Sequence, residues 1–393
     1  LWLMQIYPAV LRSVQAWFSQ KNDMSQNGIP GWRHAVQTGL LEYYQTKPKD
    51  LTLLHFYVEH GVWPSLAALL LQECACLQQI AAWTGMIEDL PWLENRISVL
   101  RAFLDASWSE SHSRFTLREH TTRTSPKGQT LTVVKQTGTH NLACEFPISH
   151  ICVEITGSRD QDHPVTLHLT GKHGRKTVKE ALVLDRFSPR DGEELVISKC
   201  EYTTLSEIEV EGLKKGNRAV ISTMDYSIHT PDFLIPLWAG ACSPAQAEKM
   251  IDENLDRMVI NGSTYPTHLK IMWLEGLLTF DRKKEAADFF KVWFLDSQEG
   301  DTSNYGKTST PLNLAQLTPI RPLLELLEIE KLDEAELVLS GFNQHLPKVN
   351  VQYKQVALTL EAHQCRVERL QGESVVNNEP GRHRVTLSEK EDS

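Results

Sequence analysis

The chain has 393 residues, with 40 basic and 50 acidic side chains, a formal net charge of −10 and a hydrophobic fraction of 41% that includes ten tryptophans. This acidic balance argues against a nucleic-acid-binding protein, which presents a basic surface to phosphate. The hydrophobic content is high enough for a packed core, which excludes disorder over most of the length.

No segment has the features of a membrane span or a secretion signal. The most apolar stretch, 63–84, is interrupted by Gln72, Glu73, Gln78 and Gln79, so it falls short of the uninterrupted run that a bilayer requires. The start of the chain lacks a basic segment and a cleavage site, and reads as the middle of a helix. We therefore expect a fragment or processed form, with reduced cysteines and a cytoplasmic location.

The first part of the chain, to about residue 108, has helical periodicity. Apolar residues recur every three or four positions over 1–18, and a polar loop follows at 21–30. Pro64 is placed to begin a second helix, for which Gly85 is a plausible stop. A third helix is expected over 90–108.

From about residue 115 to residue 226 the pattern changes to short alternating stretches separated by turns. The six predicted strands are 130–134, 151–156, 165–170, 195–198, 208–211 and 219–222. Strands of this length with regular turns are typical of a β-sandwich.

Helical periodicity returns at residue 232 and lasts to about residue 330. Ser243 and Gln246 have the spacing of a capping box, with Pro244 at the first helical position. Further helices are expected over 267–280, 282–294 and 312–329. After residue 331 the pattern is extended, with predicted strands at 348–360 and 366–370 and a last strand in the tail 381–393.

These patterns predict a helical domain interrupted by a β-sandwich. The expected divisions are a first helical part at 1–115, the inserted sandwich at 116–226, a second helical part at 227–330, and a small β segment with a tail at 331–393.

One loop has the alternation of a calcium site. Asp23, Ser25 and Asn27 stand at every second position and are followed by Gly28, so their oxygens can point inward around a cation. The loop has a single carboxylate and lacks the downstream glutamate of an EF-hand. A polar Asx-type turn is the alternative, and no required cofactor is indicated.

Two segments combine aromatic, amide and acidic residues, a combination suited to sugar recognition. They are 29–44, which contains Trp32, and 293–300, which contains Trp293. Aromatic faces stack on sugar rings, and two carboxyl groups, one protonated and one ionised, are what glycoside hydrolysis requires. No nucleotide-binding loop, zinc-protease motif or nucleophile elbow is present in the sequence.

Several of these segments resemble a known enzyme family. The segment 29–32 with Gln37-Thr38-Gly39 is similar to a substrate loop, the segment 65–85 is similar to the helix that follows that loop, and the segment 106–115 is similar to the close of the next hairpin. The most specific match is Phe233-Leu234-Ile235-Pro236-Leu237-Trp238-Ala239-Gly240. The family is that of the six-hairpin, (α/α)6 toroid glycosidases, in particular the mannosylglycerate-hydrolase-like and processing α-glucosidase-like enzymes.

The resemblance implies a mainly α toroid, incomplete at its N-terminus, that hydrolyses an α-glycosidic bond in a small saccharide with inversion. It implies that Glu42 is the general acid and Glu299 the base, with Trp32, Gln37 and Trp63 around the sugar. No nucleic-acid or membrane partner is expected, and the oligomeric state stays open.

The sequence also departs from the family pattern, which leaves two alternatives. Leu41 stands where the family has its acid, with Glu42 one residue later, so a carbohydrate-binding homologue without activity is the first alternative. A helical scaffold with a β interaction module and no sugar site is the second.

Overall fold

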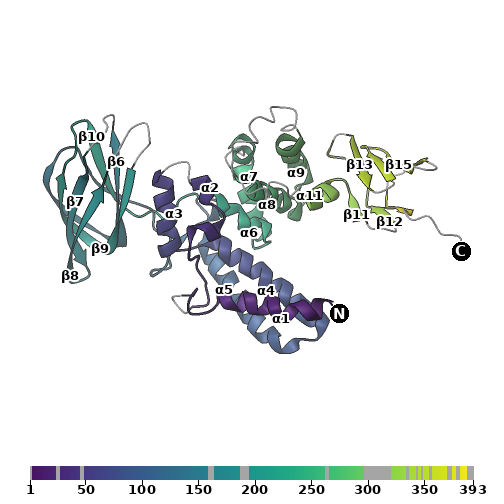
Figure 1. Cartoon of the computed structure of the whole chain (residues 1–393), viewed down its shortest axis with the longest axis horizontal. Coiled ribbons are helices and arrows are strands. Elements are labelled where there is room, and N and C mark those ends of the chain that lie inside the picture. The colour runs from purple at the N-terminus through teal and green to yellow at the C-terminus, as the bar shows by residue number, and fades with distance from the viewer. Residues whose placement is uncertain are drawn as a thin grey trace. The chain divides into compact units, whose positions relative to one another are not determined.

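The computed structural model contains two compact units, Leu1–Pro236 and Leu237–Ser393 (Figure 1). The structure describes residues 2–23, 27–44, 48–157, 163–185, 194–261, 265–295, 320–332, 336–341, 344–346, 348–353, 356–369, 374–377 and 381–386.

Unit 1 begins with a helical layer. Its helices are α1 (Trp2–Trp17), α2 (Leu41–Tyr44), α3 (Pro48–His60), α4 (Pro64–Thr84) and α5 (Leu90–Ser107), with short 3-10 helices η1 (Ala35–Thr38), η2 (Ile87–Asp89) and η3 (Pro231–Leu234). Helix α4 begins with Pro64 and ends before Gly85, whose φ of 79° lies in the left-handed region that glycine adopts readily. The predicted start and stop of this helix are confirmed.

Helix α4 is the core helix of this layer. Of the described helices, it alone is long and apolar enough to cross a membrane, but half of its most apolar window is buried inside the protein. Leu66, Leu70, Cys74 and Leu77 all face the interior. This burial is what a core helix of a soluble protein shows, and it makes a soluble protein plausible.

The strands of unit 1 form one large sheet and two small ones. They are β1 (Gly61–Val62), β2 (Trp108–Ser109), β3 (Arg114–Phe115), β4 (Arg118–Glu119), β5 (Thr130–Val134), β6 (Gly138–Gly157), β7 (Val165–His173), β8 (Lys176–Leu184), β9 (Glu194–Glu211) and β10 (Asn217–Thr223). The large sheet has the order β5-β10-β6-β9-β7-β8 with antiparallel neighbours throughout.

The large sheet curves around its own core. Residues of all six strands belong to one buried cluster, from Val134 of the edge strand β5 to Leu184 of the opposite edge strand β8. The pairing of the two longest strands, β6 and β9, shifts register at three points, and bulges of this kind bend a sheet.

Unit 2 combines helices with two small sheets. The helices are α6 (Ile235–Trp238, which begins at the boundary), α7 (Pro244–Asn261), α8 (Thr267–Thr279), α9 (Lys283–Phe290), a π-helical turn η5 (Lys291–Leu295) and α11 (Ile320–Leu326). One sheet contains β11 (Ile329–Leu332), β12 (Glu336–Leu339) and β17 (His383–Thr386); the other contains β13 (Val349–Tyr353), β14 (Val356–Leu360), β15 (Cys365–Arg369) and β16 (Ser374–Asn377).

The predicted capping box of α7 is present. The backbone N–H of Gln246 donates to Oγ of Ser243 at 3.3 Å, and the N–H of Ser243 donates to Oε1 of Gln246 at 2.9 Å. These two bonds satisfy backbone donors that a helix start leaves unpaired.

The predicted fold class, a mainly α toroid with an inserted β-sandwich, is wrong. Of the residues that the structure describes, 42% are helical and 32% are in strands, with one six-stranded sheet and several small sheets among them. Strand β8 follows the turn at Gly174 and was not predicted, and the two strands predicted at 195–198 and 208–211 belong to one long strand, β9. β-strands therefore make up more of the fold than the sequence predicted, and the six long strands of unit 1 form a single sheet.

The close approach of two strands in this sheet can be tested at Gly171 of β7. A Cβ at this position would lie 2.2 Å from the carbonyl oxygen of Thr204 on β9, where the register of the two strands shifts. We expect Gly171→Ala to lower the free energy of unfolding by about 1–3 kcal/mol in a denaturant titration. Gly31→Ala is the control, because its Cβ would meet no described atom within 4 Å; equal stability of the two variants would contradict this packing.

Candidate functional site

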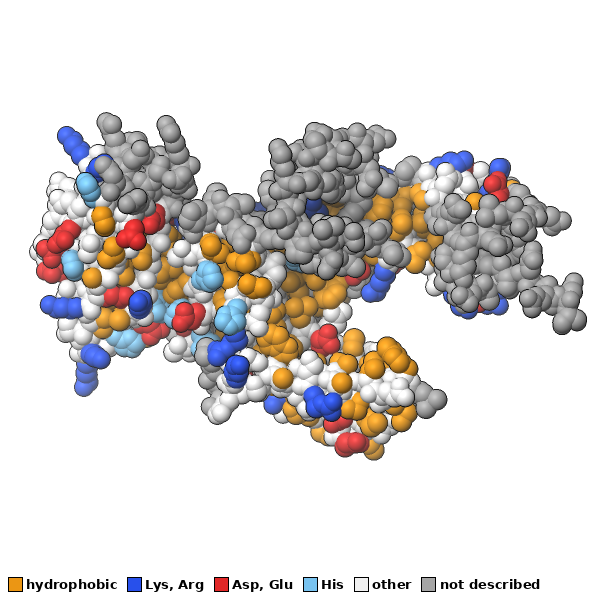
Figure 2. Space-filling model, viewed as in Figure 1, with side chains coloured by type: hydrophobic (Ala, Val, Ile, Leu, Met, Phe, Trp, Pro, Cys, Tyr) orange, Lys and Arg blue, Asp and Glu red, His pale blue; other side chains and the backbone are white. Residues whose placement is uncertain are grey.

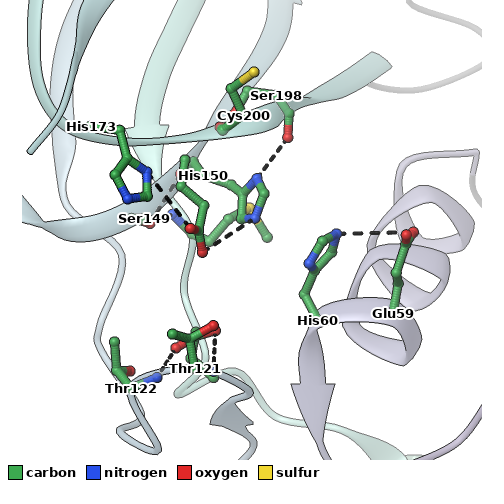
Figure 3. Close-up of polar contacts among 12 residues, drawn as sticks. Glu59, His60, Thr121, Thr122, Ser149, His150, His173, Ser198 and Cys200 are labelled. Carbon is green, nitrogen blue, oxygen red and sulfur yellow. Dashed lines mark hydrogen bonds and ion pairs between the residues drawn. The ribbon is translucent and has the colours of Figure 1, made fainter. Parts of the chain in front are cut away.

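A cluster of histidines lies where α3 meets the large sheet in unit 1. His60 at the end of α3 faces His150 of β6, with ring centroids 4.5 Å apart (Figure 3). Phe56 stacks on His60 at 4.5 Å and meets the edge of His150 at 5.1 Å. The two imidazoles therefore share one small, largely apolar space.

The hydrogen bonds of His150 fix its orientation. Its side chain is 5% exposed, and Nδ1 lies 2.8 Å from the carbonyl oxygen of Ser198, so Nδ1 carries the hydrogen and donates it. Nε2 then points toward Glu201, whose Oε1 is 3.9 Å away. The other oxygen of Glu201 lies 3.8 Å from Nδ1 of His173, so one carboxylate stands between two imidazoles.

A second carboxylate, that of Glu119 on β4, is held by backbone donors. The N–H of Thr121 donates to Oε1 at 2.7 Å, and the N–H of Thr122 donates to Oε2 (Figure 3). The buried hydroxyl of Tyr226 has no hydrogen-bond partner among the described residues. Burial, with Glu119 and Glu201 nearby, raises the pKa of Tyr226 and keeps it neutral.

The serines of this cluster are hydrogen-bonded to backbone carbonyl groups. The hydroxyls of Ser149 and Ser198 donate to the backbone carbonyls of His150, at 3.0 Å, and Cys200, at 2.7 Å, so neither serine is oriented as a nucleophile. Within the described ranges, no group of three or more His, Cys, Asp or Glu could hold a metal ion. Burial and the neighbouring His150 lower the pKa of His60.

The tryptophans predicted around a sugar are core residues in this structure. Trp63 is fully buried, and its Nε1 donates to the carbonyl oxygen of Tyr57 at 3.0 Å. Trp32 is 8% exposed and packs edge-on against Trp17 at 5.7 Å. Neither ring offers a face for stacking on a sugar, which corrects this part of the sequence interpretation.

Gln37 has a local structural role. Its Oε1 accepts hydrogen bonds from the N–H groups of Arg33, at 2.8 Å, and His34, at 3.1 Å, and so closes the turn before η1. The residue is exposed, and its role beside a sugar stays a prediction.

Asp23 and Asn27 of the predicted calcium loop accept hydrogen bonds from backbone N–H groups, and the calcium site stays a prediction. Asp23 accepts hydrogen bonds from the N–H groups of Asn27, at 3.2 Å, and Gly28, at 2.6 Å, and Oδ1 of Asn27 accepts the N–H of Ile29 at 3.0 Å. These oxygens point at backbone donors. Ser25 lies outside the described residues.

The structure does not describe the side chains of the two predicted catalytic carboxylates. Glu42 belongs to the short helix α2, but its side chain is outside the described residues, as is the whole of Glu299. Their roles stay predictions.

The structure adds a carboxyl group that the sequence interpretation did not include. Asp232, directly before the segment 233–240, is 3% exposed, and its Oδ1 has no hydrogen-bond partner among the described residues. Burial raises the pKa of Asp232, and the nearby Ser65 and Thr230 hydroxyls oppose the rise. The sequence signal that could have identified Asp232 was a single acidic residue inside an otherwise apolar run. The cluster of His60, His150 and His173 had no such signal, because the three residues are far apart in the chain.

Comparisons with known proteins do not identify the family. No protein-family model matches the sequence, and no curated protein matches it.

The lowered pKa of His60 predicts an acid-sensitive contact between α3 and the sheet. An unfolded histidine has a pKa near 6.5, so between that value and the lower folded pKa the unfolded chain binds more protons. We expect the free energy of unfolding to fall as the pH drops below about 6.5, and to fall less in His60→Gln. His55→Gln on the exposed side of α3 is the control. The same acid dependence in His60→Gln and the wild type, measured by denaturant titration, would contradict the assignment.

Proposed function

We propose that the protein acts on carbohydrate, as an inverting glycoside hydrolase of a small α-linked saccharide or glycoside. The observation that carries the proposal is the buried carboxyl group of Asp232, whose pKa burial raises and which stands directly before the segment most similar to the glycosidases. A protonated acid is one of the two groups that the reaction requires, and an ionised base is the other.

Glu42 stays the proposed acid and Glu299 the proposed base, and Asp232 becomes a second candidate for the acid. In the inverting reaction the acid protonates the leaving oxygen, while the base takes a proton from the water that attacks the opposite face of the sugar. Asp232 could serve only if substrate reaches it, because it is 3% exposed in the structure.

Two alternatives have specific support. Leu41 stands in the family's acid position, which favours a homologue that binds sugar without cleaving it. Trp2, Trp83 and Ile87 are each more than 60% exposed in the helical layer of unit 1, where Figure 2 shows apolar side chains at the surface, and such side chains favour a protein-interaction role.

The proposal also includes a cytoplasmic location. All seven cysteines are free thiols, as is usual in a reducing compartment.

Hydrolysis of 4-nitrophenyl α-glucoside and α-mannoside tests the activity. We expect Glu42→Gln and Glu299→Gln each to lower kcat by about 10²–10⁴, because general acid and base catalysis contribute that much. Glu73→Gln, an exposed change on α4, should leave the rate unchanged. If Asp232→Asn loses activity and Glu42→Gln does not, Asp232 is the acid.

The same assay separates the alternatives. Tryptophan fluorescence that changes with sugar, without release of nitrophenol, would contradict hydrolysis and favour the binding homologue. No response in either measurement would contradict the proposed function.

A further inference from the structure

Unit 2 contains a cavity beside α11. Its volume is about 590 Å³, within the usual range for sites that bind small molecules. Lys283 at the start of α9, Ser340 after β12, and residues of α11 and β11 line it.

Helix α11 has one buried side and one side that lines the cavity. Pro322, Leu326 and Leu327 at and just after the helix are buried. Arg321, Leu324 and Glu325 line the cavity, and they are three and four residues apart, so they share one side of the helix. The helix thus packs by its apolar side and presents charged groups to the cavity.

Glu328 forms a fixed part of the cavity wall. Its backbone φ of 57° lies in the left-handed region, and Ser340 N–H donates to its carbonyl oxygen at 2.8 Å. Lys283 Nζ lies 2.8 Å from Oε1, and Ser340 Oγ donates to Oε2 at 2.8 Å. Both carboxylate oxygens are therefore occupied by protein groups, and this wall exists before any ligand arrives.

Arg321 and Glu325 are different, because their hydrogen-bonding groups are available. Neither side chain has a hydrogen-bond or ion-pair partner in the part of the chain that the structure describes. Arginine only donates hydrogen bonds and an ionised glutamate only accepts them. A ligand that satisfies both must carry donors and acceptors close together.

The charges that line the cavity favour a neutral ligand. Lys283 is paired with Glu328, and Glu330 is paired with Arg382, so the lining charges that remain, those of Arg321 and Glu325, are opposite and sum to zero. A sugar hydroxyl is donor and acceptor at once, and the apolar side chains of Leu324 and Ile329 can contact the C–H face of a sugar ring.

We propose that this cavity binds a neutral saccharide, with neighbouring hydroxyls donating to the Glu325 carboxylate and accepting from the Arg321 guanidinium. The inference rests on the proposed function in its choice of ligand class, and it names a binding site made of other residues than Glu42, Glu299 and Asp232.

Calorimetric titration of the full chain with methyl α-glucoside, methyl α-mannoside and maltose tests the site. We expect binding of at least one sugar, weakened about tenfold or more in Arg321→Gln and in Glu325→Gln, because each removes charged hydrogen bonds. Arg257→Gln and Glu248→Gln are matched controls, because both residues are exposed on α7 and neither lines the cavity. Both controls should bind as the wild type does.

Hydrogen exchange of the wild-type chain gives a readout that needs no variant: bound sugar should slow exchange in peptides that cover 320–332. Unchanged binding in both cavity variants, or no binding of any of the three sugars, overturns the inference. Preferential binding of glycine or phosphate also overturns the inference, because it would show that the cavity selects a zwitterion or an anion instead of a neutral sugar. Hydrolysis of nitrophenyl glycosides is measured separately. If the protein cleaves these substrates but fails the binding tests, the saccharide site is wrong and the proposed function still stands.

Discussion

The packing of α3 against the large sheet is the constraint that makes unit 1 a single body. Lys49 pairs with Glu154 at 2.7 Å near one end of the helix, and Tyr57 Oη donates to the carbonyl oxygen of Asp225 at 2.5 Å near the other. Phe56 and Tyr57 bury their rings in this contact, each worth roughly 1.5–3 kcal/mol of transfer free energy. Because these bonds cross more than a hundred residues of sequence, the helical layer and the sheet cannot move apart without losing them together.

The sequence predicted the features that depend on residues close together in the chain better than the features that depend on contacts between distant residues. Pro64, Gly85 and the Ser243–Gln246 capping box act within a few residues, and the helices that they begin or end are confirmed. The number and order of strands depend on pairings between distant segments, such as β7 with β9, that no local pattern contains. The prediction of a toroid was wrong for the same reason. Helical periodicity shows that a helix has a buried face, but it does not show which element covers that face.

The candidate sites divide in the same way. Trp63 and Trp32 carry the aromatic character that sugar sites use, yet their burial makes them core residues, and Asp23 satisfies backbone donors. The histidine cluster, Asp232 and the α11 cavity arise from tertiary packing. Of these, Asp232 contributes a buried carboxyl group with a raised pKa, and the α11 cavity contributes paired donors and acceptors of the kind that hydroxyl groups satisfy. Both features are compatible with a protein that handles carbohydrate.

The stereochemistry of the first product tests the proposed activity most directly. Proton NMR of the full chain with an α-glycoside distinguishes the anomers before they interconvert. The account predicts that the β-anomer of the free sugar appears first, because water attacks the face opposite the leaving group. Release of the α-anomer first would contradict inversion, and no release of sugar from the α-glucoside and α-mannoside would contradict hydrolysis.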